Sequence, residues 1–192
     1  LEGRVQALDV GRASFGEQSR YFINMSAGGF SSMVSEKADE AKDRWGPLAY
    51  MRAALGTLPE LQGFKALFTV NGVERLEIET YNVIVSNGRF VAAGIPVAPH
   101  SKLDDGLLDV MIVPNVTGGQ LTLLVPQVLL GLHLDSDLIH FRKVTRLEIV
   151  SDPPMVFNLD GEVIGACPAS FEILPRALEV IVGPETEEAA AT

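Results

Sequence analysis

Alternating apolar and polar residues, interrupted by glycine and proline, run through most of the chain after residue 63. This alternation predicts strands over residues 64–70 and 73–80, which flank Asn71-Gly72, a dipeptide typical of two-residue hairpin turns. Strands so short and so closely spaced favour a β-sandwich over a parallel α/β sheet. The further strands that we expect cover residues 81–86, 106–113, 141–150, 155–159, 162–166, 169–174 and 177–182.

The first 63 residues follow a different pattern. Short strands are expected over residues 5–10 and 20–25, and Ala27-Gly28-Gly29-Phe30 predicts a tight turn that leads into a helix. A second helix is expected over residues 47–58, because a proline such as Pro47 suits the first turn of a helix.

The longest apolar run, residues 121–134, predicts a further helix. The run is shorter than the ~20 residues that a membrane-spanning helix needs, and Pro126 interrupts it, so we interpret it as a helix packed on the core. The alternative is a helix face that leans on a bilayer to reach a lipid. The predicted fold class is therefore mainly β (α+β): a two-sheet β-sandwich of short antiparallel strands with two or three inserted helices.

Composition narrows the classes of partner. The 192 residues, 47% of them hydrophobic, suffice for one good core, and we expect one β-sandwich over residues 1–183 and an acidic disordered tail over residues 184–192. The net charge of −10 argues against nucleic acid and against electrostatic anchoring to anionic lipid, so membrane contact is peripheral at most. The single Cys167 favours a reducing cytoplasm. A start at Leu1 instead of Met suggests a domain taken from a longer protein.

The segment Asp160-Gly161-Glu162 lies between two apolar stretches. One interpretation is a plain hairpin, because Asp-Gly suits a two-residue turn with positive φ angles. The other is catalytic, since two carboxylates on a rigid turn could meet one hydroxyl and one cation. Phosphoryl transfer needs an aligned acceptor, a base within ~3 Å of its proton and neutralisation of the phosphate charge. The two interpretations are compatible.

A second acidic segment contains Asp104, Asp105 and Asp109, with Gly106 bending the chain between them. Magnesium prefers oxygen ligands, and one carboxylate with the carbonyls of a tight loop could hold it. The alternative is a solvated turn before a strand.

Other polar residues give weaker indications. The pair Asn87-Gly88 predicts a close approach of the backbone to a ligand or to the opposite sheet, and Arg89 is either a phosphate contact or a surface residue. The three histidines show no metal-ligand spacing. Cys167 lies among apolar strand residues without a nearby base, which predicts a buried, inert thiol.

Taken in order, several segments resemble the diacylglycerol kinase and sphingosine kinase-like lipid kinases, a superfamily that also includes the NAD kinases. The similarity is closer to the C-terminal domain of soluble bacterial diacylglycerol kinases, and it runs from about residue 20 to residue 183. The segments that carry it are FINMSAGGF, WGPLAYMRAALGTL, SNGRFVAAGIPVAP, SKLDDGLLDVMIV and FNLDGE.

The resemblance implies a β-sandwich that follows an N-terminal domain with a Gly-Gly-Asp-Gly-Thr nucleotide loop, a segment that this sequence does not contain. It implies that Glu162 accepts the proton of the lipid hydroxyl and that Asp160 is a second essential carboxylate, acting through Mg²⁺ or the γ-phosphate. It also implies a structural Mg²⁺ site made by the Asp105 side chain with the carbonyls of Lys102 and Leu107. ATP would be bound mainly by the absent domain, so its contacts cannot be placed on this chain.

The implied function is part of an ATP-dependent lipid kinase that transfers the γ-phosphoryl group to the hydroxyl of diacylglycerol or a related lipid in phospholipid biosynthesis. We expect the isolated chain to be inactive, because phosphoryl transfer needs a positioned nucleotide. One open alternative is a kinase of another acceptor, a sphingoid base or NAD, on the same scaffold. Another is a non-catalytic sandwich for binding or oligomerisation, in which exposed sheet edges could pair two chains into a homodimer. The expected location is the cytoplasm, with transient contact at the inner face of the membrane.

Overall fold

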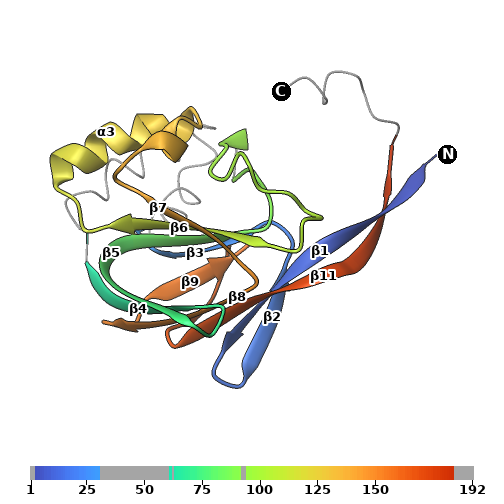
Figure 1. Cartoon of the computed structure of the whole chain (residues 1–192), viewed down its shortest axis with the longest axis horizontal. Coiled ribbons are helices and arrows are strands. Elements are labelled where there is room, and N and C mark those ends of the chain that lie inside the picture. The colour runs from blue at the N-terminus through green and yellow to red at the C-terminus, as the bar shows by residue number, and fades with distance from the viewer. Residues whose placement is uncertain (1–2, 31–60, 62, 92–93, 184–192) are drawn as a thin grey trace.

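The computed structural model describes residues 3–30, 61, 63–91 and 94–183 (Figure 1). Over these residues, eleven strands form one antiparallel sheet, accompanied by helix α3 and a short 3-10 helix, η3. The elements are β1 (Arg4–Phe15), β2 (Gln18–Phe22), β3 (Met25–Gly29), β4 (Phe64–Val70), β5 (Glu74–Ser86), β6 (Leu108–Pro114), α3 (Gly118–Leu129), η3 (His133–Asp135), β7 (His140–Val144), β8 (Arg146–Asp152), β9 (Val156–Leu159), β10 (Glu162–Ala166) and β11 (Ala169–Val182).

Strand β5 connects the two layers of the sandwich. Its first half pairs with β4, and its second half pairs with both β3 and β6. A shift in register between Thr80 and Asn82 marks the bend, where the buried Thr80 hydroxyl donates to the Val113 carbonyl at 2.6 Å. The strand order is β10-β9-β3-β5-β4-β8-β11-β1-β2, with β6 pairing with β5 and β7. The predicted mainly-β sandwich is confirmed, and its layers are continuous through β5.

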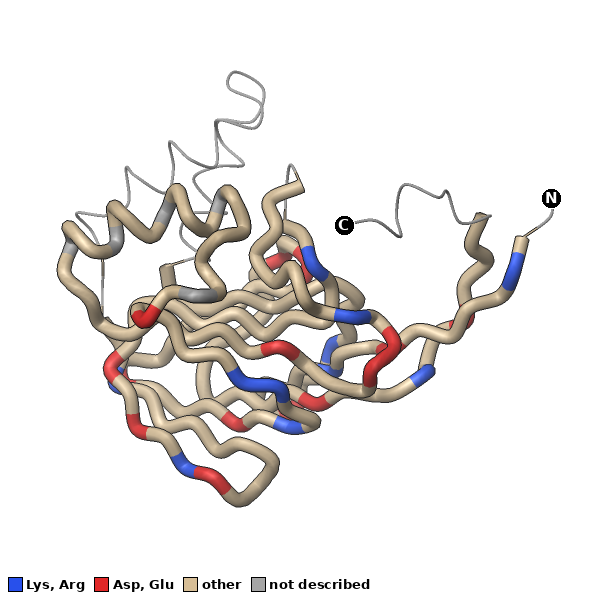
Figure 2. The backbone as a smooth tube through the Cα atoms, turned by 45° about the horizontal axis from the view of Figure 1, so that its top comes forward, with Lys and Arg blue, Asp and Glu red and all other residues tan. Residues whose placement is uncertain are grey.

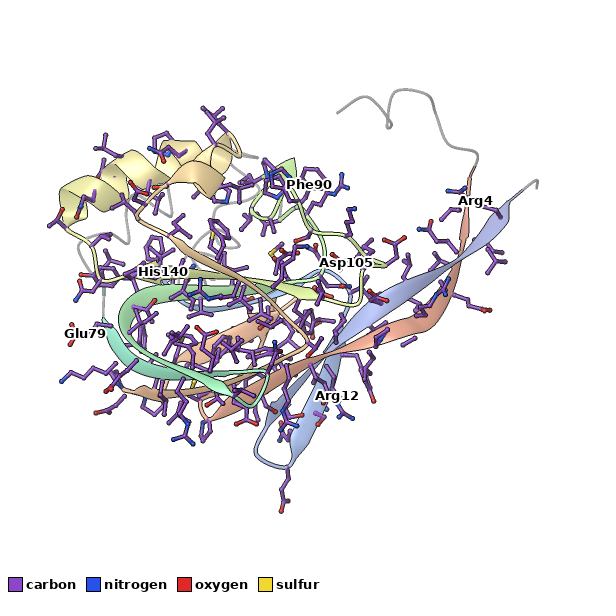
Figure 3. The ribbon with its side chains drawn as sticks, viewed as in Figure 1. Arg4, Arg12, Glu79, Phe90, Asp105 and His140 are labelled. Carbon is purple, nitrogen blue, oxygen red and sulfur yellow. The ribbon has the colours of Figure 1, made fainter. Side chains whose placement is uncertain are left out.

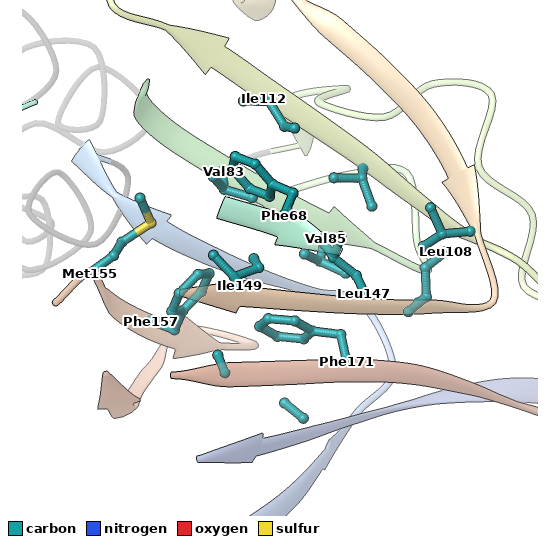
Figure 4. Close-up of a cluster of buried hydrophobic side chains, with 14 of the residues drawn as sticks. Phe68, Val83, Val85, Leu108, Ile112, Leu147, Ile149, Met155, Phe157 and Phe171 are labelled. Carbon is teal, nitrogen blue, oxygen red and sulfur yellow. The ribbon is translucent and has the colours of Figure 1, made fainter. Parts of the chain in front are cut away.

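The main core lies between the layers and follows from strict alternation along the strands. In β4 every second residue from Phe64 to Val70 is buried, while Lys65 and Leu67 are exposed. Phe157 of β9 and Phe171 of β11 meet near the centre with ring centroids 5.3 Å apart (Figure 4). Burying a large apolar side chain contributes about 1.5–3 kcal/mol, so this cluster dominates the stabilisation of the fold.

A second apolar cluster covers the outer face of the layer that contains β3, β5 and β6. Helix α3 lies over this face (Figure 1), and its Leu124 packs with Met111 and Val113 of β6. A capping box begins the helix, because the Thr117 hydroxyl accepts from the Gln120 N–H while the Gln120 side chain accepts from the Thr117 N–H. The first part of the apolar run thus forms a core-packed helix that contains Pro126, as predicted, but this helix ends at Leu129 and the short η3 follows from His133. No helix in the described part of the chain is both long and apolar enough to cross a bilayer.

The predicted tight turn at Ala27-Gly28-Gly29-Phe30 is wrong, since Met25–Gly29 is the buried strand β3. The glycines serve close packing instead. A Cβ on Gly28 would overlap the Phe157 ring, and a Cβ on Gly29 would overlap the Tyr81 carbonyl. Both positions need glycine because a side chain there would collide with a neighbouring group. Gly29 also has a positive φ of 77°, which glycine adopts readily.

Several strand boundaries differ from the prediction. The expected strand over residues 141–150 is two strands, β7 and β8, and the expected pair 169–174 and 177–182 is the single strand β11. In β11, Arg176 has φ 53°, and the partner β1 shifts register between Leu8 and Val10, so an irregularity absorbs Pro175 without ending the strand. The helix predicted after residue 30, the helix over residues 47–58 and the tail over 184–192 lie outside the described residues.

Strands β1 and β11 extend together as a twisted ribbon that projects from the rest of the sandwich (Figure 1). The ribbon carries exposed apolar side chains, including Val5 and Ile181. An ion pair between Arg12 and Glu172 links its two strands closer to the core.

Candidate functional site

The hairpin between β9 and β10 carries the first predicted acidic segment. Leu159 pairs with Glu162, and the two residues between them form the turn. Asp160 has φ 46° and Gly161 has φ 99°, so both adopt the left-handed region that the Asp-Gly pair predicts. The hairpin interpretation is confirmed, and the two carboxylates stand at its tip.

The Asp160 carboxylate is bound to the turn between β2 and β3. Its Oδ2 accepts from the N–H of Ile23 at 2.9 Å, and its Oδ1 accepts from the N–H groups of Asn24 and Met25 at 3.1 and 2.8 Å. The backbone N–H of Asp160 in turn donates to the Met25 carbonyl at 2.9 Å. This carboxylate therefore joins two turns that are about 135 residues apart in the sequence.

Glu162 differs from Asp160 in its surroundings. It is exposed, and its carboxylate makes no hydrogen bond or ion pair with the described residues. The backbone beneath it is held in the β9–β10 pairing opposite Leu159. The structure thus presents one anchored and one accessible carboxylate on the same hairpin tip.

Asn24 extends the hydrogen-bond network from Asp160 to the segment that follows β5. Its carbonyl accepts from the N–H groups of Asn87 and Gly88 at 2.8 and 2.7 Å, and its side-chain amide donates to the Phe90 carbonyl at 2.7 Å. Gly88 is required for this contact, because a Cβ there would overlap the Asn24 side chain. The close backbone approach predicted at Asn87-Gly88 is therefore to the β2–β3 turn.

A pocket of about 710 Å³ lies beside this network. Residues 88–90 and 101–104 form two walls of the pocket. Arg89 links these walls, because its Nε donates to the carbonyl of the buried Ser101 at 3.0 Å. Acidic and basic residues are interspersed over the described backbone, and the Lys and Arg residues drawn there form no single continuous patch (Figure 2). The lining comes from residues 23–24, 88–90 and 101–104, with Gln6. The turn bound by Asp160 and the loop that leads to Asp105 therefore border one concavity.

The second predicted segment forms the loop before β6. Asp105 is drawn below Phe90 in the view of Figure 3, and its Oδ1 accepts from the N–H of Leu107 at 3.1 Å. Lys102 is exposed and lines the pocket, whereas Leu107 is half-buried. The three residues of the predicted Mg²⁺ site therefore lie in one short loop.

A lysine that the sequence interpretation did not single out binds this loop. The Lys143 ammonium of β7 donates to Oδ2 of Asp105 at 2.9 Å and lies 3.5 Å from Oδ1 of Asp109. Burial acts to lower the pKa of Lys143, but the hydrogen bond that its ammonium donates to Asp105 and the charge of Asp109 outweigh it, so this pKa lies above its ordinary value. Both oxygens of Asp105 are thus engaged, and the described residues contain no group of three or more Asp, Glu, His or Cys side chains arranged to hold a metal. The Asp105 carboxylate does not fit a divalent cation while Lys143 is bound to it.

Asp9 is another residue bound to this loop that the sequence interpretation missed. It is fully buried in β1, and its carboxylate accepts from the N–H of Gly106 at 2.6 Å and of Arg176 at 2.8 Å. Its own N–H donates to the Leu103 carbonyl at 2.7 Å. An acid inside the apolar strand pattern 8–10 was the available signal, because a buried carboxylate needs such partners.

Two further titratable side chains are buried away from this network. Burial lowers the pKa of His133, although the hydrogen bond between its Nε2 and the Val97 carbonyl partly offsets the effect. Burial likewise raises the pKa of the Cys167 thiol, which agrees with the predicted inert cysteine.

Comparison with known proteins places this geometry in context. Residues 24–182 match the family model described as the YegS C-terminal NAD kinase beta sandwich-like domain. The chain is 27% identical over 190 residues to a diacylglycerol kinase of Bacillus subtilis and 32% identical over 178 residues to a protein of Xanthomonas euvesicatoria named probable lipid kinase YegS-like. These matches cover 98% and 91% of this chain but only 61% and 57% of the two relatives.

Solved structures agree with the sequence comparison. A crystal structure from Bacillus anthracis, described as that of a candidate diacylglycerol kinase, superposes with a TM-score of 0.73 at 27% identity. The superposition covers 94% of this chain and 58% of that protein. The similarity therefore includes nearly all of the sandwich and leaves a large part of the solved protein without a counterpart.

Proposed function

The chain belongs to the YegS C-terminal NAD kinase beta sandwich-like family, and we propose that it forms the acceptor-side domain of an ATP-dependent lipid kinase. The reaction would transfer the γ-phosphoryl group of ATP to the hydroxyl of diacylglycerol or a related lipid alcohol. The names of the relatives, diacylglycerol kinase and YegS-like lipid kinase, support this class of substrate. The observation that carries the proposal is the accessible Glu162 carboxylate on a hairpin tip whose Asp160 binds Ile23 and Asn24 of the pocket wall.

Glu162 would act as the base that accepts the proton of the lipid hydroxyl. A base must approach the attacking oxygen to within about 3 Å, and an exposed carboxylate without a partner among the described residues is available for that contact. Enzymes of this type gain most of their rate from positioning and charge neutralisation, so a well-placed carboxylate suffices as the protein's proton acceptor.

Asp160 would be the second essential carboxylate, with a different task. Its three amide hydrogen bonds support an anchoring role, in which it holds the hairpin tip against the β2–β3 turn. A carboxylate offers about four lone-pair positions, so one on Oδ2 remains for a cation or a phosphate-bound proton donor. Asp160 can therefore fix the position of Glu162 and still take part in a single further contact.

ATP, as its magnesium complex, would be bound mainly by a nucleotide-binding domain outside this sequence. The chain spans about 60% of the length of the relatives that it matches, and it contains no Gly-Gly-Asp-Gly-Thr segment. Because phosphoryl transfer depends on an aligned nucleotide, we expect the 192-residue chain alone to be inactive. We place the working kinase in the cytoplasm, with transient contact at the membrane that contains its lipid.

An acceptor screen tests the substrate class. The chain would be joined to a nucleotide-binding domain of a relative and supplied with labelled ATP and detergent-dispersed diacylglycerol, a sphingoid base or NAD. Phosphorylation of diacylglycerol or another lipid alcohol is the expected outcome, because the net charge of −10 does not favour an anionic dinucleotide and the Lys and Arg positions are interspersed with acidic ones along the described backbone (Figure 2). Labelling of NAD alone would contradict the proposed acceptor and would support the dinucleotide kinase alternative.

A further inference from the structure

An ion cluster made by three elements occupies the place where a structural metal was predicted. It consists of Asp105 in the loop before β6, Asp109 in β6 and Lys143 in β7. We infer that Lys143 is a built-in cation that takes the place of a divalent metal at Asp105, so that lysine and metal are mutually exclusive occupants of this site. The inference does not depend on the proposed kinase activity.

The register between β6 and β7 places Lys143 next to Asp109. Lys143 is paired with Asp109 across the β6–β7 ladder, so the two side chains emerge as direct neighbours. From there the ammonium reaches the Asp105 oxygen at hydrogen-bond distance, 2.9 Å. The position of Lys143 therefore follows from the pairing of β6 with β7.

A metal and the ammonium would compete for the same carboxylate, that of Asp105. Magnesium binds carboxylate oxygens at about 2.0–2.1 Å, whereas the Lys143 nitrogen already lies 2.9 Å from Oδ2 of Asp105. A dication that close to an ammonium is repelled strongly, and the other Asp105 oxygen accepts the Leu107 N–H. Metal entry therefore requires Lys143 to leave.

The loop is already ordered by protein groups alone. Lys143 holds Asp105 from one side, and the buried Asp9 holds the N–H of Gly106 from the other at 2.6 Å. The same loop continues back to residues 101–104, which line the pocket. Lys143 is thus a positioning residue that supports the pocket wall, a task that a structural metal would otherwise perform.

Thermal unfolding with and without Mg²⁺ tests the inference in the unaltered protein and three variants. Lys143→Met removes the ammonium but keeps most of the apolar stem. Arg142→Met is the matched control, because it removes the same charge from the adjacent position of β7, where the guanidinium lies 3.8 Å from Glu74 and is not part of the cluster. The remaining samples are the unaltered protein and the double variant Lys143→Met with Asp105→Asn.

The expected unfolding temperatures distinguish competition between Lys143 and Mg²⁺ from a simple ion pair. The unaltered protein and Arg142→Met show no Mg²⁺-dependent rise in unfolding temperature. Lys143→Met unfolds at a lower temperature without metal and regains stability with Mg²⁺, half-maximally at a concentration at least about tenfold below the highest one that leaves the unaltered protein unchanged. The double variant loses this response, because the ligand carboxylate is gone.

Two results would overturn the inference. If the unaltered protein is stabilised by Mg²⁺ as strongly as Lys143→Met, the lysine and the metal do not compete. If Lys143→Met is destabilised and its unfolding temperature never responds to Mg²⁺, Lys143 forms an ordinary ion pair and does not take the place of a metal. Both readings use the unfolding temperature alone, so they remain distinct from any failure of the lipid kinase proposal.

Discussion

Replacing Asp160 with alanine tests whether this carboxylate anchors the hairpin tip. Three backbone N–H groups, those of Ile23, Asn24 and Met25, would lose their acceptor. Ile23 is exposed and Asn24 is half-buried, so water can replace the carboxylate at both at a loss of about 0.5 kcal/mol each. Met25 is 4% exposed, and its unsatisfied N–H costs about 1.5–2 kcal/mol. Alanine at φ 46° adds about 1 kcal/mol of backbone strain.

The expected loss in the free energy of unfolding is therefore about 3.5–4 kcal/mol, a large share of the 5–15 kcal/mol that typical domains possess. Asp160→Asn should lose only about 1 kcal/mol, because asparagine keeps one acceptor oxygen and tolerates the left-handed backbone. Urea-induced unfolding monitored by circular dichroism gives both values. Glu162→Gln is the control on the same hairpin, expected within about 0.5 kcal/mol of the unaltered protein. An Asp160→Ala protein as stable as this control would refute the anchoring role.

Three further predictions use other parts of the fold. Gly88→Ala should destabilise the protein by about 1–3 kcal/mol, since its Cβ would displace Asn24, whereas Gly119→Ala in α3, with open space around it, should be neutral or stabilising in the same urea titration. The pKa of His133 is lowered, so below pH 6.5 the unfolded state binds a proton that the folded state resists. Stability should fall as pH drops through that range, by at most about 1.4 kcal/mol per pH unit for this group, and His133→Phe should flatten the fall. Cys167, buried and with a raised pKa, should react with a thiol reagent only as fast as the protein unfolds, and rapid labelling of the folded protein would contradict its burial.

The local parts of the fold were predictable because their causes are local. Asn71-Gly72 and Asp160-Gly161 lie in hairpin turns with positive φ at all four residues, as the dipeptides predict. The first turn is one residue longer than predicted, because Val70 pairs with Glu74 and Val73 belongs to the turn. The alternation in residues 64–70 matches strand β4 residue for residue. Turn chemistry and period-two alternation act within a few residues, so one sequence contains enough information to show them.

The misassigned and missed parts depend on contacts between distant segments. Gly28 suggested a turn, but its small size serves the Phe157 ring, which is 129 positions further along the chain. Lys143 reaches Asp105 because β6 and β7 pair in one particular register, and no local pattern specifies that register. Asp9 was hidden for the same reason, since its partners Gly106 and Arg176 come from two other segments.

The candidate site likewise combines features that the sequence predicted with contacts that only the structure shows. The sequence pattern and the family resemblance together identified the acids at 160 and 162, and the structure places both on one hairpin tip. The different surroundings of these acids became visible only in three dimensions, because the anchor of Asp160 is the turn at residues 23–25. The assignment of Glu162 as the base stays a prediction.

The most direct measurement of the proposed function is lipid phosphorylation by the Glu162→Gln variant, made in a kinase that joins this chain to a nucleotide-binding domain. Removing a general base typically slows catalysis by about 10²–10⁴-fold, and the exposed position of Glu162 predicts an unchanged unfolding temperature. A folded variant with turnover reduced to that extent is the expected result. A folded variant that phosphorylates lipid at the normal rate would contradict the assignment of Glu162 and the function built on it.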